Sequence, residues 1–233
     1  MKENIYLLVH GFNGNPGELE YLNQYLQDKG LDARTVLLDG HGSDKKALRK
    51  SSHTSWLNSV ETVLLELAQE YKHITLIGFS MGGLLCINFA SLPGIDKIIL
   101  INTPIYFWNL KIILSDVAKG IFSKKFEKVA YYKKSVFGVS AKSGIDFLRL
   151  LAKSKQRLKE IKIPSLVLQC RNDESVHFKS GKYIKDKIGG NADLKYYDGG
   201  YHQVFESELK DLVCDDVYAY NKLIVQPFLK VSA

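Results

Sequence analysis

Short apolar segments alternate with longer amphipathic ones along the chain, a pattern typical of βαβ units and a parallel sheet. Five short segments share β-branched and aliphatic character and predict buried strands at 5–9, 34–38, 74–79, 97–101 and 165–170. A sixth segment, 193–197, is more polar, which predicts a strand at an edge of the sheet, where one face meets solvent.

Amphipathic segments between these strands predict helices at 18–29, 55–71, 81–91, 175–188 and 206–228. In the last of them, apolar residues recur at helical spacing through Leu209, Leu212, Val213, Val217 and Tyr220. We expect this helix to cover one face of the sheet. The predicted fold class is α/β, with a mostly parallel central sheet and helices on both faces.

The segment 104–163 interrupts this alternation. It shows no strand pattern, is rich in aromatic residues and predicts two or three helices inserted between adjacent strands. Insertions of this length usually serve as lids or binding loops. We therefore predict one domain over 1–233, carrying a helical cap subdomain over 104–163.

Composition narrows the class of protein. The chain has 233 residues, of which 45% are hydrophobic and 24% charged, values that exclude a disordered or fibrous protein. The net charge is +7, and the segment 104–163 holds 14 basic against 4 acidic residues, so it carries +10 and the remainder −3. We interpret this basic cap as a solvated helical surface in preference to a contact with anionic substrate or an anionic lipid surface. Without a nucleic-acid-binding motif, we expect no nucleic-acid partner.

Several features predict a cytoplasmic location. Three widely spaced cysteines, Cys86, Cys170 and Cys214, do not form the pattern of a disulfide framework. The apolar segment near the start, 5–9, is too short for the core of a secretory signal. The segment 74–95 has no charge over 22 positions, but its glycines, serines, asparagine and proline favour a buried strand followed by a buried helix over a membrane span.

A candidate nucleophile lies in Gly78-Phe79-Ser80-Met81-Gly82, a G-x-S-x-G motif between a predicted strand and a predicted helix. So sharp a turn leaves no room for side chains two positions either side of Ser80, which explains the glycines. Ser80 would lie above the sheet at a helix N-terminus, where free N–H groups favour developing negative charge. The motif does not fit dinucleotide binding, because Ser80 occupies the place of the required second glycine.

Two backbone N–H groups are candidates for stabilising an oxyanion. One comes from the residue after the nucleophile, Met81, and the other from the loop after the first strand, in His10-Gly11-Phe12. We assign the two donors to the Phe12 and Met81 amides. The imidazole of His10 is expected to be structural.

A serine hydroxyl needs a histidine to accept its proton. Of the six histidines, His202 lies in a glycine-containing loop past the last strand, from which it can reach the edge of the sheet where Ser80 sits. The segment around His177 predicts a helix start, His53 and His73 flank another helix, and His41 lies in a turn-like loop suited to a pocket wall.

A carboxylate must hold that histidine in the right tautomer, and in the Ser, acid, His chain order it lies between the other two. Asp173 follows the apolar strand 165–170, at the functional edge of a parallel sheet. Glu174 and Asp198 are its rivals. We favour Asp173, because Asp198 ends its own strand and lies too close along the chain to His202 for a bond without strain.

Together these motifs resemble the α/β-hydrolase superfamily, in particular its small bacterial carboxylesterases and monoacylglycerol lipases. The resemblance spans nearly the whole chain. It is carried by His10-Gly11-Phe12-Asn13-Gly14-Asn15, the loop 38–42, the helix with Trp56, the segment 78–83, Asn172-Asp173, and Tyr201-His202 with Glu206 behind them. One departure is Gly-Tyr-His, where relatives often have Ser-Gly-His.

The resemblance implies Ser80 as nucleophile, Asp173 as acid, His202 as base, and the Phe12 and Met81 amides as oxyanion donors. It also implies hydrolysis of carboxylic esters of short to medium acyl chains, or of monoglycerides, through an acyl-enzyme and without a metal or organic cofactor. A cap inserted at 104–163 matches the place where relatives carry theirs.

An apolar wall for the ester is expected from Phe12, Met81, Tyr106, Phe107 and Trp108. Two other functions stay open. The same three residues would serve a thioesterase or acyltransferase acting on acyl thioesters, and a hydrolase-like ligand-binding protein would keep the site without turnover. Acyl-chain length, the alcohol and the oligomeric state are not specified by these patterns.

Overall fold

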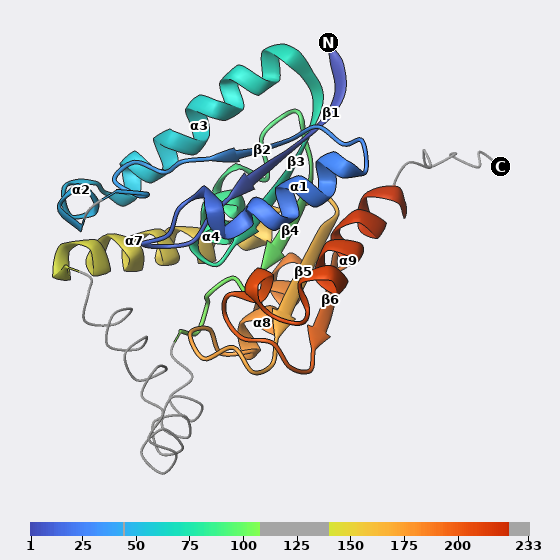
Figure 1. Ribbon diagram of the computed structural model, residues 1–233. Helices are drawn as coiled ribbons and strands as arrows, with labels where there is room; N and C mark the ends of the chain where they lie inside the picture. Colours follow the sequence, from blue (N-terminus) through green and yellow to red (C-terminus); the bar gives the residue numbers. More distant parts are fainter. Residues whose placement is uncertain (44, 108–139, 224–233) are drawn as a thin grey trace.

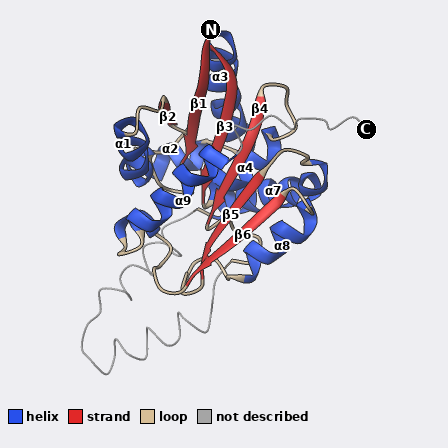
Figure 2. Cartoon of the chain, turned by 90° about the vertical axis from the view of Figure 1, so that its right-hand side faces the viewer, coloured by secondary structure: helices blue, strands red, loops and turns tan. Residues whose placement is uncertain are grey.

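Six parallel strands form the centre of the protein in a computed structural model, which describes residues 1–43, 45–107 and 140–223. The sheet has the order β2-β1-β3-β4-β5-β6, and each pair of neighbours is parallel (Figures 1 and 2). The strands are β1 (Lys2–Val9), β2 (Ala33–Val36), β3 (Tyr71–Phe79), β4 (Ile95–Ile101), β5 (Ser165–Cys170) and β6 (Ala192–Tyr197).

Helices cover both faces of this sheet. The α-helices are α1 (Glu20–Asp28), α2 (Lys45–Lys50), α3 (His53–Glu70), α4 (Met81–Phe89), α7 (Ala141–Arg157), α8 (Lys179–Ile188) and α9 (Lys210–Leu223). Short 3-10 helices are η1 (Pro16–Leu19), η2 (Leu158–Glu160) and η3 (Val204–Glu206). Helices α1 and α9 pack on one face, and α3, α4, α7 and α8 on the other. The predicted fold class is confirmed.

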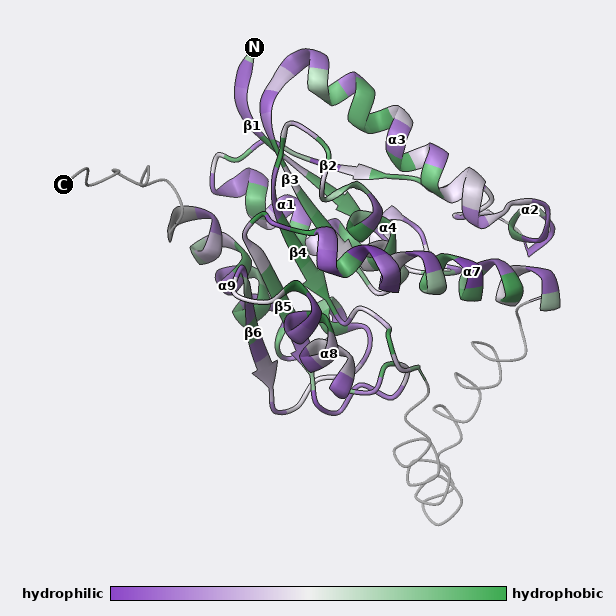
Figure 3. Ribbon diagram, turned by 180° about the vertical axis from the view of Figure 1, so that it is seen from behind, coloured by the Kyte–Doolittle hydropathy of each residue, from purple (hydrophilic) through white to green (hydrophobic). Residues whose placement is uncertain are grey.

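Burial on both faces explains the apolar strands. In β1, Leu7 and Val9 belong to the core beneath α3 and α4, whereas Tyr6 and Leu8 belong to the core beneath α1 and α9. A parallel sheet with helices on both faces therefore requires apolar residues at consecutive positions. Figure 3 shows the result, with apolar central strands, a more hydrophilic edge strand β6 and hydrophilic residues on the outward helix surfaces.

Differences from the predicted elements concern mainly their ends. The strand at 165–170 has the expected bounds, β6 lies at the sheet edge as predicted, and β1 and β3 begin earlier than expected, at Lys2 and Tyr71. Helix α8 begins at Lys179, not at 175, because the preceding residues turn around Asp173. Helix α9 begins at Lys210, after a separate 3-10 turn, and the expected extension over 224–228 lies outside the described residues.

Between the adjacent strands β4 and β5 lies the predicted insertion, of which α7 and η2 are described. Residues 108–139, including Trp108, lie outside the described part of the chain. The apolar segment 74–95 forms β3 and α4, and no helix in the described ranges is long and apolar enough to cross a membrane. The cysteines are unpaired and buried.

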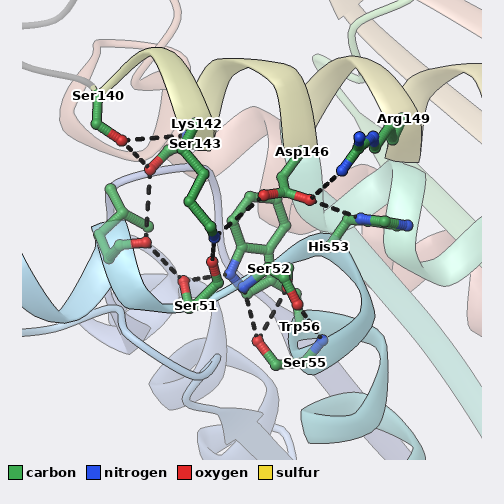
Figure 4. Close-up of polar contacts among 11 residues, drawn as sticks. Ser51, Ser52, His53, Ser55, Trp56, Ser140, Lys142, Ser143, Asp146 and Arg149 are labelled. Carbon is green, nitrogen blue, oxygen red and sulfur yellow. Dashed lines mark hydrogen bonds and ion pairs between the residues drawn. The ribbon is translucent and has the colours of Figure 1, made fainter.

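A polar cluster fixes α7 to the rest of the fold. Buried Asp146 binds the Nδ1 atom of His53, the first residue of α3, through Oδ1 at 2.8 Å (Figure 4). Lys142 lies 3.3 Å from Oδ2 and also donates to the Ser51 carbonyl, and Arg149 lies 3.6 Å from Oδ1. The cluster joins the described part of the insertion to the start of α3.

Candidate active site

Ser80 occupies a tight turn between β3 and α4. Its backbone has φ 52° and ψ −124°, in a region that residues other than glycine rarely adopt. A Cβ atom on Gly82 would lie 1.9 Å from the Val9 carbonyl oxygen, and one on Gly78 would lie 2.5 Å from the Gly83 backbone. The predicted need for glycine at these two positions is confirmed, because only a missing side chain permits so close an approach.

The structure brings Ser80, His202 and Asp173 into one hydrogen-bonded chain. His202 Nε2 lies 2.9 Å from Ser80 Oγ, and His202 Nδ1 lies 2.8 Å from Asp173 Oδ2. The three residues follow β3, β6 and β5, so the carboxyl ends of three parallel strands supply them. All three are buried, with Asp173 fully inaccessible to solvent.

Local backbone groups fix the Asp173 carboxylate. Its Oδ1 atom accepts the Ser175 and Val176 N–H groups at 2.8 and 2.7 Å, which leaves Oδ2 for His202. Burial by itself lowers the pKa of His202, but Asp173 and the other carboxylates nearby outweigh it, so the pKa is raised above the ordinary imidazole value. The site therefore favours a positive charge on this ring.

The two rival carboxylates have other partners than the His202 ring. Glu174 is buried and its Oε2 atom accepts the backbone N–H of His202 at 3.1 Å. Burial, followed by the charge of Asp173, raises the pKa of Glu174. Asp198 has a side chain 91% exposed and pairs with Arg171 at 3.0 Å. Of the three candidates, Asp173 is the one that contacts the His202 imidazole.

Asn102 is a site residue that the sequence analysis did not identify. Its Nδ2 atom donates to the His202 carbonyl at 3.1 Å, and its Oδ1 atom accepts the Cys170 N–H at 2.9 Å. Its φ of 46° lies in the left-handed region, which asparagine tolerates better than most residues. A polar residue directly after the buried strand β4 was the available signal. Asn102 and Glu174 together hold the His202 backbone from both sides.

Met81 and the loop that precedes Phe12 lie beside Ser80. Met81 is the first residue of α4, so its N–H is among those that have no partner inside the helix. A Cβ on Gly11 would lie 3.3 Å from the Ser80 Cβ, which places the loop preceding Phe12 against the nucleophile. Among the described residues, no backbone acceptor takes a hydrogen bond from the Phe12 or Met81 amide.

His10 and His41 support this loop. The Nδ1 atom of His10 contacts the Gly11 carbonyl at 2.9 Å, and its Nε2 atom accepts the Leu38 N–H at 3.2 Å. Burial lowers the pKa of His10 to about 4, so the ring is neutral, in agreement with the expected structural role. His41 is buried and its ring lies 6.2 Å from that of Phe12.

Aromatic residues extend outward from Phe12. Its ring lies 5.5 Å from that of Phe147 on α7, which in turn meets Phe107 edge-on at 6.0 Å. Phe147 was not singled out from the sequence, because its helical spacing is equally typical of core packing. Tyr106 packs on Tyr183 of α8 at 5.7 Å.

The other residues of the expected wall are placed differently or not described. The side chain of Met81 lies in the core shared with α3 and α4, and Trp108 lies outside the described residues. Within the part of the chain that the structure describes, no three His, Cys, Asp or Glu side chains form a cluster that could hold a metal ion.

Comparison with known proteins defines the family. The family model described as "alpha/beta hydrolase fold" matches residues 6–134, more than half of the chain, and the chain therefore belongs to this family. A second model, "Serine aminopeptidase, S33", matches residues 123–210.

Two curated relatives are an esterase and a lipase. A carboxylesterase of Bacillus subtilis is 25% identical over 222 residues, which cover 92% of this chain and 90% of the relative. A thermostable monoacylglycerol lipase of a Bacillus species is 27% identical over 181 residues, 73% of this chain and 70% of the relative.

Solved structures agree in fold. The structure of a metagenome-derived lipolytic enzyme matches with a TM-score of 0.77 at 18% identity. The match covers 95% of this chain and 94% of the enzyme's chain. The monoacylglycerol lipase of Paleococcus ferrophilus has a TM-score of 0.70 at 16% identity, with 93% of both chains covered.

Proposed function

We propose that the protein is a serine hydrolase of carboxylic esters, of the carboxylesterase or monoacylglycerol lipase type. The observation that carries this proposal is the bridge that His202 makes between Ser80 Oγ at 2.9 Å and Asp173 Oδ2 at 2.8 Å. The names of the relatives, carboxylesterase and monoacylglycerol lipase, support the substrate class.

In the proposed mechanism, His202 Nε2 accepts the Ser80 hydroxyl proton as Oγ attacks the ester carbonyl carbon. The carbonyl π electrons move to oxygen, and the oxyanion accepts hydrogen bonds from the Phe12 and Met81 amides. Collapse of this intermediate breaks the bond to the alcohol oxygen, which takes the proton from His202. The acyl group remains on Ser80.

Water completes the cycle. His202 accepts a proton from the attacking water, a second oxyanion forms and collapses, and the proton returns to Ser80 Oγ as the carboxylic acid leaves. Asp173 holds Nδ1–H toward itself, which orients Nε2 toward Ser80 and stabilises the imidazolium. The raised pKa of His202 fits this role. Each step uses side chains and amides of this chain together with water.

The aromatic residues next to the site suggest where the acyl or alcohol group lies. Phe12, Phe147 and Phe107 form a continuous series of rings that begins at a proposed oxyanion residue. We propose that these rings pack on the apolar part of the ester, and that the segment 104–163 is the cap that supplies this side of the pocket.

Turnover measurements test the proposal. We expect Ser80-dependent hydrolysis of p-nitrophenyl esters in a series from acetyl to palmitoyl, measured beside a monoglyceride and an acyl-CoA. Ser80→Ala should remove turnover while the melting curve stays that of the wild type. Ser91→Ala, an equal change at an exposed serine, is the matched control and should retain full activity.

The pattern of rates separates the candidate functions. A preference for short or medium acyl chains supports a carboxylesterase, and a preference for the monoglyceride supports a lipase. A preference for acyl-CoA over the matched simple ester would replace the proposal with a thioesterase. Absence of Ser80-dependent turnover on every substrate would favour a ligand-binding protein.

A further inference from the structure

Glu18 contacts two segments of the candidate site, the loop before Phe12 and the residue after His202. It belongs to η1, whose first turn is capped by Asn15, since the Asn15 side chain accepts the Gly17 N–H at 2.8 Å. The turn directs the Glu18 carboxylate back toward the loop after β1. Glu18 is half-buried at this place.

The two carboxylate oxygens of Glu18 have different partners. Oε2 accepts a hydrogen bond from the backbone N–H of Gly11 at 2.9 Å, and Oε1 accepts one from the Nε2 group of Gln203 at 2.8 Å. Gly11 precedes Phe12, a proposed oxyanion donor, and Gln203 follows His202, the proposed base. One carboxylate therefore joins the loop of Gly11 to the loop of Gln203, although Glu18 and Gln203 are 185 positions apart in the chain.

The glycines of the first loop leave space for this carboxylate. A Cβ on Gly14 would lie 2.2 Å from a Glu18 carboxylate oxygen, and one on Gly11 would lie 3.2 Å from Oε2. A side chain at position 14 would therefore displace the Glu18 head group. The contact of the Glu18 carboxylate with this loop therefore explains why glycines stand at positions 11 and 14. The sequence motif His10-Gly11-Phe12-Asn13-Gly14 does not by itself reveal this contact.

We propose that Glu18 is a positioning residue that holds the Phe12 amide and the His202 imidazole in register around Ser80. The inference rests on the proposed function, because it assigns Glu18 a role in the same acyl transfer. A shift of about 1 Å in a reacting group costs roughly a hundredfold in rate, so a link that fixes two reacting groups at once has a measurable effect.

The charge of Glu18 gives the link a second consequence. Both of its partners are N–H donors, which suits an ionised carboxylate. Burial raises the pKa of Glu18, and the hydrogen bonds from Gln203 and Gly11 oppose this shift. The groups that face His202 are Asp173, Glu174 and Glu18, whose negative charges favour the imidazolium, and Glu206 also faces Glu18.

Three substitutions separate geometry from charge. Glu18→Ala removes the link and the charge, and Gln203→Leu breaks the link but keeps the charge. Glu18→Gln removes the charge but still offers an acceptor to Gly11 and, once the Gln203 amide turns over, a bond to that side chain. Glu20→Gln, at an exposed glutamate two positions on, is the matched control.

For Glu18→Ala we expect kcat to fall about tenfold or more, with KM changed less than about twofold, because the link acts on the reacting groups. The acidic limb of the pH profile should move to lower pH, since loss of a negative charge lowers the pKa of His202. Gln203→Leu should lower kcat without moving that limb. Glu18→Gln should move the limb and lose less kcat than Glu18→Ala.

Unchanged kcat and an unchanged acidic limb in Glu18→Ala and in Gln203→Leu would overturn the inference. So would an equal effect of Glu20→Gln. Thermal melting followed by circular dichroism identifies a variant that fails to fold; if Glu18→Ala does so, the other two variants carry the test.

A second readout keeps this inference separate from the ester substrate. A p-nitrophenyl alkylphosphonate modifies the serine of a hydrolase with the help of the same oxyanion loop and base, and no ester substrate is required. The rate of modification is measured by release of p-nitrophenol, and mass spectrometry locates the modification at Ser80. A slower reaction in Glu18→Ala supports the inference even if no ester is hydrolysed. Ser80-dependent ester turnover that is insensitive to Glu18 would overturn the inference and leave the proposed function standing.

Discussion

Two Asp–His pairs of the protein have the same contact geometry. In both, a carboxylate oxygen lies 2.8 Å from an imidazole Nδ1 atom, and the pairs are Asp173–His202 and Asp146–His53. Both aspartates are buried. The pairs differ in what surrounds them: Nε2 of His202 meets the Ser80 hydroxyl, whereas the Asp146–His53 pair joins two helices in a cluster with Lys142 and Arg149 (Figure 4). The Asp–His contact alone therefore does not distinguish the proposed catalytic histidine, His202, from His53.

The charges around each pair explain the difference further. Asp173 has the carboxylate of Glu174 next to it in sequence, and the net effect on His202 is a raised pKa. For Asp146, burial favours the neutral acid, but the hydrogen bonds from His53 and Lys142 outweigh it and the pKa is lowered. The first environment stabilises a proton on histidine, and the second stabilises a carboxylate that anchors α7.

The largest expected difference between the pairs is in turnover. Asp173→Asn should lower kcat by about 10⁴, as in well-studied triads, because Nδ1 would lose the acceptor that fixes its tautomer. Asp146→Asn should leave kcat within a few-fold of the wild type. Initial rates on the preferred ester, with melting curves for both variants, check this. A mild loss in Asp173→Asn with a severe one in Asp146→Asn would reverse the roles assigned to the pairs.

As the pH is lowered, activity should be lost at a higher pH than the contacts of Asp146 that fix α7. In the proposed mechanism His202 must be neutral to accept the Ser80 proton, so kcat/KM should fall about tenfold per pH unit below the pKa of His202. Because that pKa is raised, the fall should begin at a higher pH than for an ordinary imidazole. A pH profile of kcat/KM, taken with far-UV circular dichroism at each pH, checks this. A rate that stays level below the ordinary imidazole pKa would contradict the prediction.

The smallest expected effect concerns stability. Asp146→Asn should lower the free energy of unfolding by about 1–2 kcal/mol, since Lys142 and Arg149 would lose a buried anionic partner. A lowered pKa in the folded state means that the stabilisation is present above the ordinary aspartate pKa and is lost as pH falls through the lowered one.

Urea unfolding at neutral pH and near pH 3 measures this contribution. Asp186→Asn, which breaks an exposed pair with Lys182, is the matched control and should change stability by less than about 0.5 kcal/mol. Equal effects of the two substitutions, or a loss in Asp146→Asn that does not shrink in acid, would refute the anchoring role.

Local pattern was sufficient for much of the fold. The strand at 165–170 was predicted with its observed bounds because it holds the apolar run Leu166-Val167-Leu168, with Pro164 before it and Arg171 after it. The start of α8 was predicted too early because residues after β5 have helical spacing but their N–H groups bind Asp173. Helix α2 was not predicted, since its short basic sequence has one buried residue, Leu48.

Part of the candidate site could also be predicted from local sequence pattern. Ser80 and His202 stand in glycine-containing turns after strands, which the sequence displays directly. Asn102, Phe147 and Glu18 act through partners far along the chain, and no local pattern distinguishes them from ordinary turn, core or surface residues. The roles proposed for them rest on three-dimensional contacts that a single sequence does not contain.

The strand order has a consequence for refolding. Ser80, Asp173 and His202 follow β3, β5 and β6, and β5 reaches the sheet only by pairing with β4 across the long insertion, as Ile98 does with Ser165. Pairings between distant segments are slow, because the intervening chain loses entropy when its ends meet. After dilution from denaturant, helical signal should therefore recover before Ser80 regains reactivity, and that reactivity reports the completed sheet.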